Sequence, residues 1–137
     1  MKQTTSRISL AIITVASFAL SSCEKDKGIL PEISFKTGAG YTSADATVAK
    51  TMAFLVGVNA AKTEDKDVLK TFNASVSYDG GVSSTVYSET LTATQGDNYN
   101  HDLNLTTRNQ SGTEKYIFTV TNRDGLINTI SLNITVP

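Results

Sequence analysis

Alternation of apolar residues in the last quarter of the chain limits the possible folds more than any other pattern in the sequence. Every second residue is apolar in 116–121 and again in 130–136, and in 130–136 the positions between them hold Thr, Ser and Asn. A period of two is typical of a half-buried strand. The two runs are joined by residues 122–125, which end in Asp-Gly. This spacing predicts an antiparallel hairpin.

Alternation of apolar and polar residues is also found earlier in the chain. Residues 72–78 alternate up to a second turn at Asp79-Gly80-Gly81, and a Ser/Thr-rich run follows it. Further strands are expected over 33–36, 52–60, 82–92 and 99–105. No apolar pattern with a 3.6-residue period is sustained after residue 22, and the many Thr and Val residues disfavour helices. Seven strands with turns at this spacing predict an all-β fold, a single antiparallel β-sandwich.

The N-terminal residues have a different character. Lys2 and Arg7 precede an uncharged apolar stretch over 8–20, which ends in small residues before Cys23. This is the pattern of a secretory signal peptide. Thirteen uncharged residues are too few for a helix that crosses a hydrocarbon core, which takes about 20. The sequence therefore predicts that residues 1–22 are removed.

Cys23 is the only cysteine, and the run Leu20-Ser21-Ser22-Cys23 resembles the lipobox of bacterial lipoproteins. The resemblance implies cleavage before Cys23 and attachment of lipid to its thiol. Two or more acyl chains hold a protein stably on a membrane. The alternative is an ordinary signal peptide followed by a chance free thiol.

Charged residues follow the cysteine at once, as Glu24-Lys25-Asp26-Lys27. They resemble the acidic signal that sends Bacteroidetes lipoproteins to the outer cell surface, although a plain solvated linker has the same composition. We expect a lipidated tether over 23–30 and a folded domain over 31–137. The expected location is the outer membrane, lipid-anchored and surface-exposed, with a periplasm-facing orientation left open.

Cleavage leaves 115 residues, the size of one domain. Loss of Lys2 and Arg7 reduces the 12 basic residues to 10 against 13 acidic ones, so the formal charge becomes −3. Without a basic patch, nucleic-acid binding is not expected. The mature chain cannot form an internal disulfide and has no Trp, so its stability is expected to come from an aliphatic core.

A second resemblance is carried by residues 114–126 and the closing run 134–136. They look like the last two strands of bacterial immunoglobulin-like (Ig-like) domains, in which a tyrosine at the place of Tyr116 is frequent. Gly112 lies four residues before Tyr116 rather than two, which departs from the usual tyrosine corner. The whole chain thus resembles a small Bacteroidetes-type surface lipoprotein with one Ig-like domain, and such a fold leaves the function open.

A search for catalytic residues finds little. His101 is the only histidine, and its phase places it at the core edge with one hydrogen bond. Cys23 is acylated in the predicted mature form, so neither nucleophilic catalysis nor a zinc site is expected. Without a catalytic constellation, we interpret the chain as a non-enzyme with no cofactor other than the lipid on Cys23.

Alternating strands would bring the loops 59–67, 94–98 and 122–125 to the pole nearest the tether. Their carboxylates suggest a calcium site as one hypothesis, because calcium takes six to eight oxygen ligands. Interleaved Lys62, Lys66 and Arg123 favour plain solvated turns instead. The candidate ligands are Asp65, Asp67, Asp97 and Asp124.

The opposite pole would carry 38–42, 79–81 and 108–112, where Tyr41 and Arg108 are the binding candidates because Tyr and Arg recur as interface anchors. The function expected first is a non-catalytic surface module for adhesion or for contact with a protein partner. The alternative is a carbohydrate-binding accessory of a glycan-uptake system, with Tyr41, Tyr87 and Tyr99 as platforms.

Overall fold

Strands account for nearly all the regular structure in the computed structural model, which describes residues 28–137. The predicted signal peptide and Cys23 lie outside the described residues. The elements, in chain order, are β1 (Glu32–Phe35), β2 (Ala46–Thr47), β3 (Ala53–Ala61), β4 (Leu69–Tyr78), β5 (Ser84–Thr90), the 3₁₀ turn η1 (Ala93–Gln95), β6 (Asn98–Thr106), β7 (Gly112–Asn122) and β8 (Ile127–Val136).

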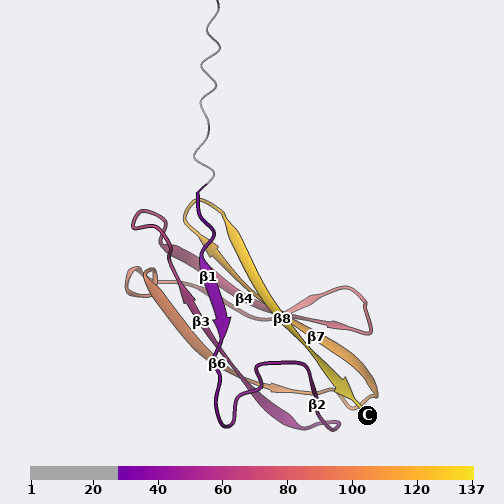
Figure 1. Ribbon diagram of the computed structural model, residues 1–137. Coiled ribbons are helices and arrows are strands. Elements are labelled where there is room, and N and C mark those ends of the chain that lie inside the picture. Colours follow the sequence, from indigo (N-terminus) through magenta and orange to yellow (C-terminus); the bar gives the residue numbers. More distant parts are fainter. Residues whose placement is uncertain (1–27) are drawn as a thin grey trace, which may run out of the picture.

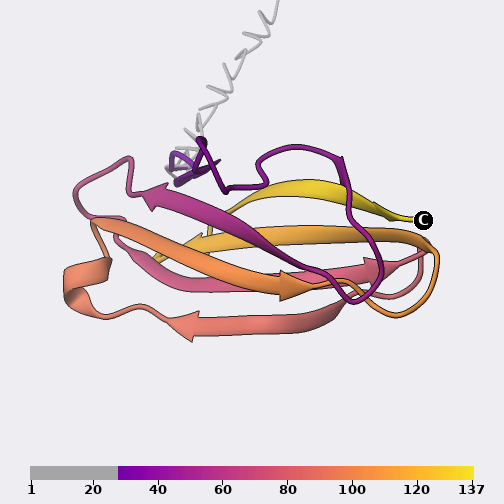
Figure 2. The same ribbon diagram turned by 90° about the horizontal axis from the view of Figure 1, so that it is seen from below.

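The strands form two sheets that face each other. The smaller sheet has the order β1-β3-β6 and the larger has the order β2-β8-β7-β4-β5. Figure 1 shows β1 starting at one end of the molecule and the C-terminus lying at the other. Figure 2 shows the layers from a second direction. The prediction of an all-β Ig-like sandwich is confirmed.

The C-terminal hairpin forms as its alternation predicts. Tyr116 pairs with Leu132, and Phe118 pairs with Ile130. The Asn122 side-chain oxygen closes the turn by accepting hydrogen bonds from the backbone N–H groups of Asp124, at 3.1 Å, and Leu126, at 2.9 Å. Both strands extend beyond the predicted bounds, because backbone pairing continues through polar residues at their ends.

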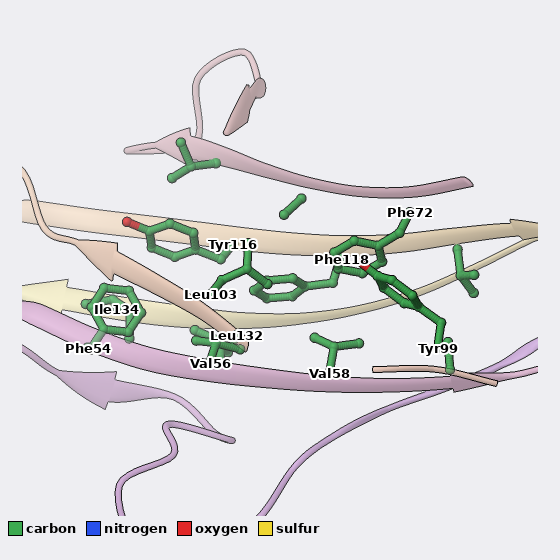
Figure 3. Close-up of a cluster of buried hydrophobic side chains, with 14 of the residues drawn as sticks. Phe54, Val56, Val58, Phe72, Tyr99, Leu103, Tyr116, Phe118, Leu132 and Ile134 are labelled. Carbon is green, nitrogen blue, oxygen red and sulfur yellow. The ribbon is translucent and has the colours of Figure 1, made fainter. Parts of the chain in front are cut away.

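The core lies between the two sheets, as Figure 3 shows. Val56 and Val58 of the smaller sheet, and Phe72 and Phe118 of the larger, are fully buried. The ring of Phe118 meets that of Phe35 edge-on, with 5.6 Å between the ring centroids. Such edge-to-face contacts add to the stabilisation from burial. The core is mainly aliphatic with a few aromatic rings, in line with the composition.

Two details differ from the sequence-based expectation. The strand expected over 82–92 is shorter, and Val86 bulges out where the pairing with β4 shifts register. The two-residue strand β2 was not predicted and pairs in parallel with β8. It is held by Asp45, which accepts a 2.7 Å hydrogen bond from the Asn133 backbone N–H. Two residues are too few to show a period, so this strand left no pattern to detect.

The three loops that alternation assigned to one pole do meet there. Lys62 donates its backbone N–H to the Asp97 carbonyl at 3.0 Å, and Arg123 donates to the Val68 carbonyl at 2.8 Å. The strand β1 starts at this end too, since Glu32 pairs with Ala61. We call this end the entry pole, and the other end, where β4 turns into β5, the distal pole.

Candidate functional site

A shallow groove crosses the outer face of the smaller sheet, on the side away from the core. Register aligns Glu32, Ala61 and Asn98 across the three strands, and the next outward-facing row holds Ser34, Asn59 and Asn100. These rows line a groove of about 250 Å³. Closed pockets for small molecules span about 300 to 1,000 Å³. A smaller open groove suits contact with part of an extended ligand.

Amide side chains dominate this face, which we call the amide face and define as Glu32, Ser34, Asn59, Asn98, Asn100 and Asn104. All six residues are exposed. The small Ala61 lies between Glu32 and Asn98 in the same row. Each asparagine amide offers two N–H donors and an acceptor oxygen. Successive outward positions of β6 carry Asn98 and Asn100, so their amides follow the strand at the spacing of alternate residues. The face therefore presents paired donors and acceptors in rows.

One end of the amide face is closed by a lysine, a tyrosine and an aspartate. The Lys36 ammonium donates to Asp102 at 2.7 Å, and the Tyr41 hydroxyl donates to the other oxygen of that carboxylate at 3.0 Å. The ammonium also lies 3.4 Å from the Asn100 side-chain oxygen. The bond from Lys36 holds the pKa of Asp102 below its ordinary value. Tyr41 is thus fixed beside the groove.

Gly57 makes room for this closure. A Cβ atom at Gly57 would come within 2.6 Å of both the Lys36 and the Tyr41 side chains. These two side chains therefore lie flat across the β3 backbone, where any larger residue would displace them. Tyr41 is half-buried and keeps part of its ring accessible.

Arg108 contacts other residues than Tyr41 does. Its guanidinium donates to Asp79, packs 4.8 Å over the Tyr78 ring and lies 3.7 Å from the buried Glu114 carboxylate. The bond from Arg108, with help from the Thr113 backbone N–H, lowers the pKa of Asp79. The guanidinium of Arg108 is therefore engaged in contacts within the distal pole. Within the described residues, the side-chain partners of Arg108 and those of Tyr41 have no residue in common.

A second cluster of tyrosines closes the open side of the sandwich between β5 and β6. The hydroxyls of Tyr87 and Tyr99 donate to the same oxygen of Glu89, at 2.8 and 2.6 Å, and Gln95 donates to the other. The bonds from Tyr99, Tyr87 and Gln95 lower the pKa of Glu89. Burial and the charge of Glu89 raise the pKa of Tyr99.

These contacts determine which of the tyrosines predicted as sugar platforms are accessible. The expectation of an accessible Tyr99 is wrong, because its side chain is buried against Phe72. Tyr87 is half-buried and stacks on His101, with ring centroids 4.5 Å apart. The backbone position of Tyr99 lines the groove while its side chain is buried, whereas Tyr41 lies at the end of the amide face, against Asp102. The signal that was missed is the row of outward-facing asparagines in 98–104, which lie between the apolar residues used to predict that strand.

His101 lies at the core edge, as its phase indicates. Its ring is held by stacking with Tyr87 and Tyr99, and no hydrogen bond from its side chain is seen within residues 28–137. Glu32 is the one carboxylate that lines the groove. Glycoside hydrolysis uses a pair of carboxyl groups. The groove therefore offers groups for binding, and the described residues bring no such pair to it.

The structure does not gather the four calcium candidates into one cluster. Asp65 and Asp97 share Lys62, at 3.5 and 2.8 Å, while Asp67 and Asp124 lie 3.9 and 3.8 Å from Arg123. Within the described part of the chain, no group of three His, Cys, Asp or Glu residues is placed to hold a metal ion. Basic side chains take the place that a cation would occupy.

Comparison with known proteins gives information about the fold alone. No protein-family model matches the sequence, and no curated protein matches it. A superoxide reductase (neelaredoxin) from Ignicoccus hospitalis superposes with a TM-score of 0.54 and 9% identity, over 80% of this chain and 81% of that chain. A Listeria innocua beta-glucosidase gives 0.48 at 12% identity, over 78% of this chain and 16% of that one. Murine CRIg gives 0.44 at 10% identity, over 78% and 98%. The first of these likenesses supports the sandwich architecture.

Proposed function

We propose that the protein is a non-catalytic, lipid-anchored module of the outer cell envelope that binds carbohydrate through the amide face. The observation that carries this proposal is the groove itself, in which Asn59, Asn98 and Asn100 present donors and acceptors side by side. Adjacent sugar hydroxyls each donate and accept, so one amide can bond two of them at once. Tyr41 supplies an aromatic surface at one end.

The chemistry of this face favours a sugar over a protein. Interfaces with proteins usually contain aromatic and Arg anchors in a core that excludes water. None of the large hydrophobic residues that are exposed lies on β1, β3 or β6. Arg108, the expected anchor, is engaged within the fold.

A protein partner is the second candidate, and a different observation favours it. The strand β5 forms one edge of the larger sheet and has unpaired backbone groups along its free side. Val86 on this strand is 44% exposed. Exposed edges can accept a strand from another chain. The bulge at Val86 limits the length over which such pairing could run.

A glycan array probed with the mature protein tests the carbohydrate proposal. We expect binding to a limited set of glycans, and a loss of at least tenfold in affinity when Asn59→Ala and Asn100→Ala are combined. Asn109→Ala, an exposed asparagine on the distal loop, is the matched control and should bind normally. Equal binding by all three proteins would reject the amide face as the site.

The anchor is tested separately in cells. Protease treatment of intact cells should remove the native protein, and Cys23→Ala should abolish its membrane association. Protection in intact cells, with cleavage only after lysis, would place the protein on the periplasmic side.

A further inference from the structure

Exposed aliphatic side chains gather where the chain enters the domain. Ile29, Leu30 and Ile127 are 57%, 50% and 54% exposed. All three belong to the entry pole, because Ile29 and Leu30 directly precede β1 and Ile127 opens β8 after the β7–β8 turn. In Figure 1 this turn lies beside the start of β1. Single exposed apolar residues are ordinary, but three at one pole require an explanation.

The entry segment is fixed to this pole by specific contacts. The Ile29 backbone N–H donates to Glu64 at 3.2 Å, and the Thr63 hydroxyl lies 3.0 Å from the Leu30 carbonyl. Asn128 donates to the Pro31 carbonyl at 2.8 Å. These bonds tie the backbone while both aliphatic side chains remain exposed. The rigid part of the protein therefore begins at residue 29.

Chain length then limits how far this pole can lie from a lipid on Cys23. Six residue steps separate Cys23 from Ile29, which span at most about 22 Å when fully extended. The strand β8 has ten residues and is about 33 Å long. The entry pole is thus kept closer to the bilayer than the distal pole in any upright orientation.

We propose that the entry pole rests on the bilayer, with Ile29, Leu30 and Ile127 inserted among the lipid headgroups. This inference rests on the proposed lipid anchor at Cys23. Aliphatic side chains favour the boundary between headgroups and acyl chains, where binding strength scales with the buried apolar area. Contact at this pole would fix the orientation of the domain instead of leaving it to pivot on its tether.

The charge of the pole indicates which lipid surface it fits. The loops 62–68, 92–97 and 122–126 carry five acidic residues against three basic ones, a net charge of −2. Lys62 and Arg123 are already paired with carboxylates of the same loops. Such a surface is not attracted to anionic lipids, so a zwitterionic surface is the expected partner.

The absence of Trp from the chain provides a clean test. The mature lipidated protein is reconstituted in phosphatidylcholine vesicles as one of two single-Trp variants, Ile127→Trp or the control Val82→Trp. Val82 is 96% exposed and lies in the β4–β5 connection at the distal pole. We expect brominated lipid to quench at least half of the Ile127→Trp emission, which should also shift to shorter wavelength. The Val82→Trp emission should change by less than a tenth. Leu30→Trp serves as a second probe if Ile127→Trp does not fold.

Flotation and mass measurement separate the two proposals. If the protein is lipidated and floats with vesicles but Ile127→Trp and Val82→Trp are quenched equally, the contact is wrong and the anchor stands. If no lipid is attached and the protein does not float, the anchor is wrong and the contact fails with it.

Discussion

Two glutamates of this protein accept hydrogen bonds from tyrosine hydroxyls, in opposite surroundings. Glu114 is 0% exposed and accepts from Tyr116, at 2.7 Å, and from the Arg108 backbone N–H, at 2.9 Å. Glu89 is half-buried at the side of the sandwich and accepts from Tyr87 and Tyr99. The donors are alike, and access to water separates the two sites.

This difference in exposure determines how strongly the stability of the fold depends on the hydrogen bonds of each glutamate. A buried carboxylate is tolerated only when it is paired and hydrogen-bonded, and losing a partner leaves an uncompensated charge. Water can replace a lost donor at Glu89, whereas the site of Glu114 excludes it. Arg108 completes the buried site, which explains why a predicted surface anchor is engaged in the fold.

The largest difference between the two sites is expected on deleting each glutamate. Glu114→Ala should reduce the free energy of unfolding by about 3 to 5 kcal/mol, because Arg108 and Tyr116 lose their buried partner. Glu89→Ala should cost about 1 kcal/mol. Urea unfolding followed by circular dichroism measures both. Equal losses would show that exposure does not distinguish the sites.

Removing one hydroxyl at each site should give a smaller difference. Tyr116→Phe leaves a Glu114 oxygen buried without a donor and should cost about 2 kcal/mol. Tyr99→Phe leaves Glu89 with Tyr87 and Gln95, so the expected cost is about 1 kcal/mol. The same unfolding measurements apply, and a larger cost for Tyr99→Phe would reverse the comparison.

The smallest effect is expected in the dependence of stability on pH. The hydrogen bond from Tyr99 is the main cause that holds the pKa of Glu89 below its ordinary value in the folded protein. Its contribution to stability is therefore present at neutral pH and is lost as the pH falls through the folded pKa. Glu89→Gln should lose less stability than the native protein between pH 6 and pH 3, measured by urea unfolding at each pH. Parallel curves would contradict the assignment.

The amide face shows which parts of the candidate site could be predicted from the sequence. Outward positions of a strand were predictable from alternation, and Asn98, Asn100 and Asn104 occupy them in 98–104. Tyr41 was named from its residue type, and its hydroxyl contacts Asp102 at the end of the amide face. Ser34 and Asn59 come from other strands, and no local pattern indicates which of their residues stand beside Asn100.

Strand period and turn chemistry are local properties, so the alternation of residues predicted the strands, the C-terminal hairpin and the loops that share each pole. Which side chains meet depends instead on contacts between distant parts of the chain. Register between strands distant in sequence placed Ser34 beside Asn59 and Asn100. Packing of the distal pole placed Arg108 against Asp79 and Glu114 instead of in solvent. Such pairings depend on non-local contacts that form together, and a periodic pattern within one strand carries no information about them.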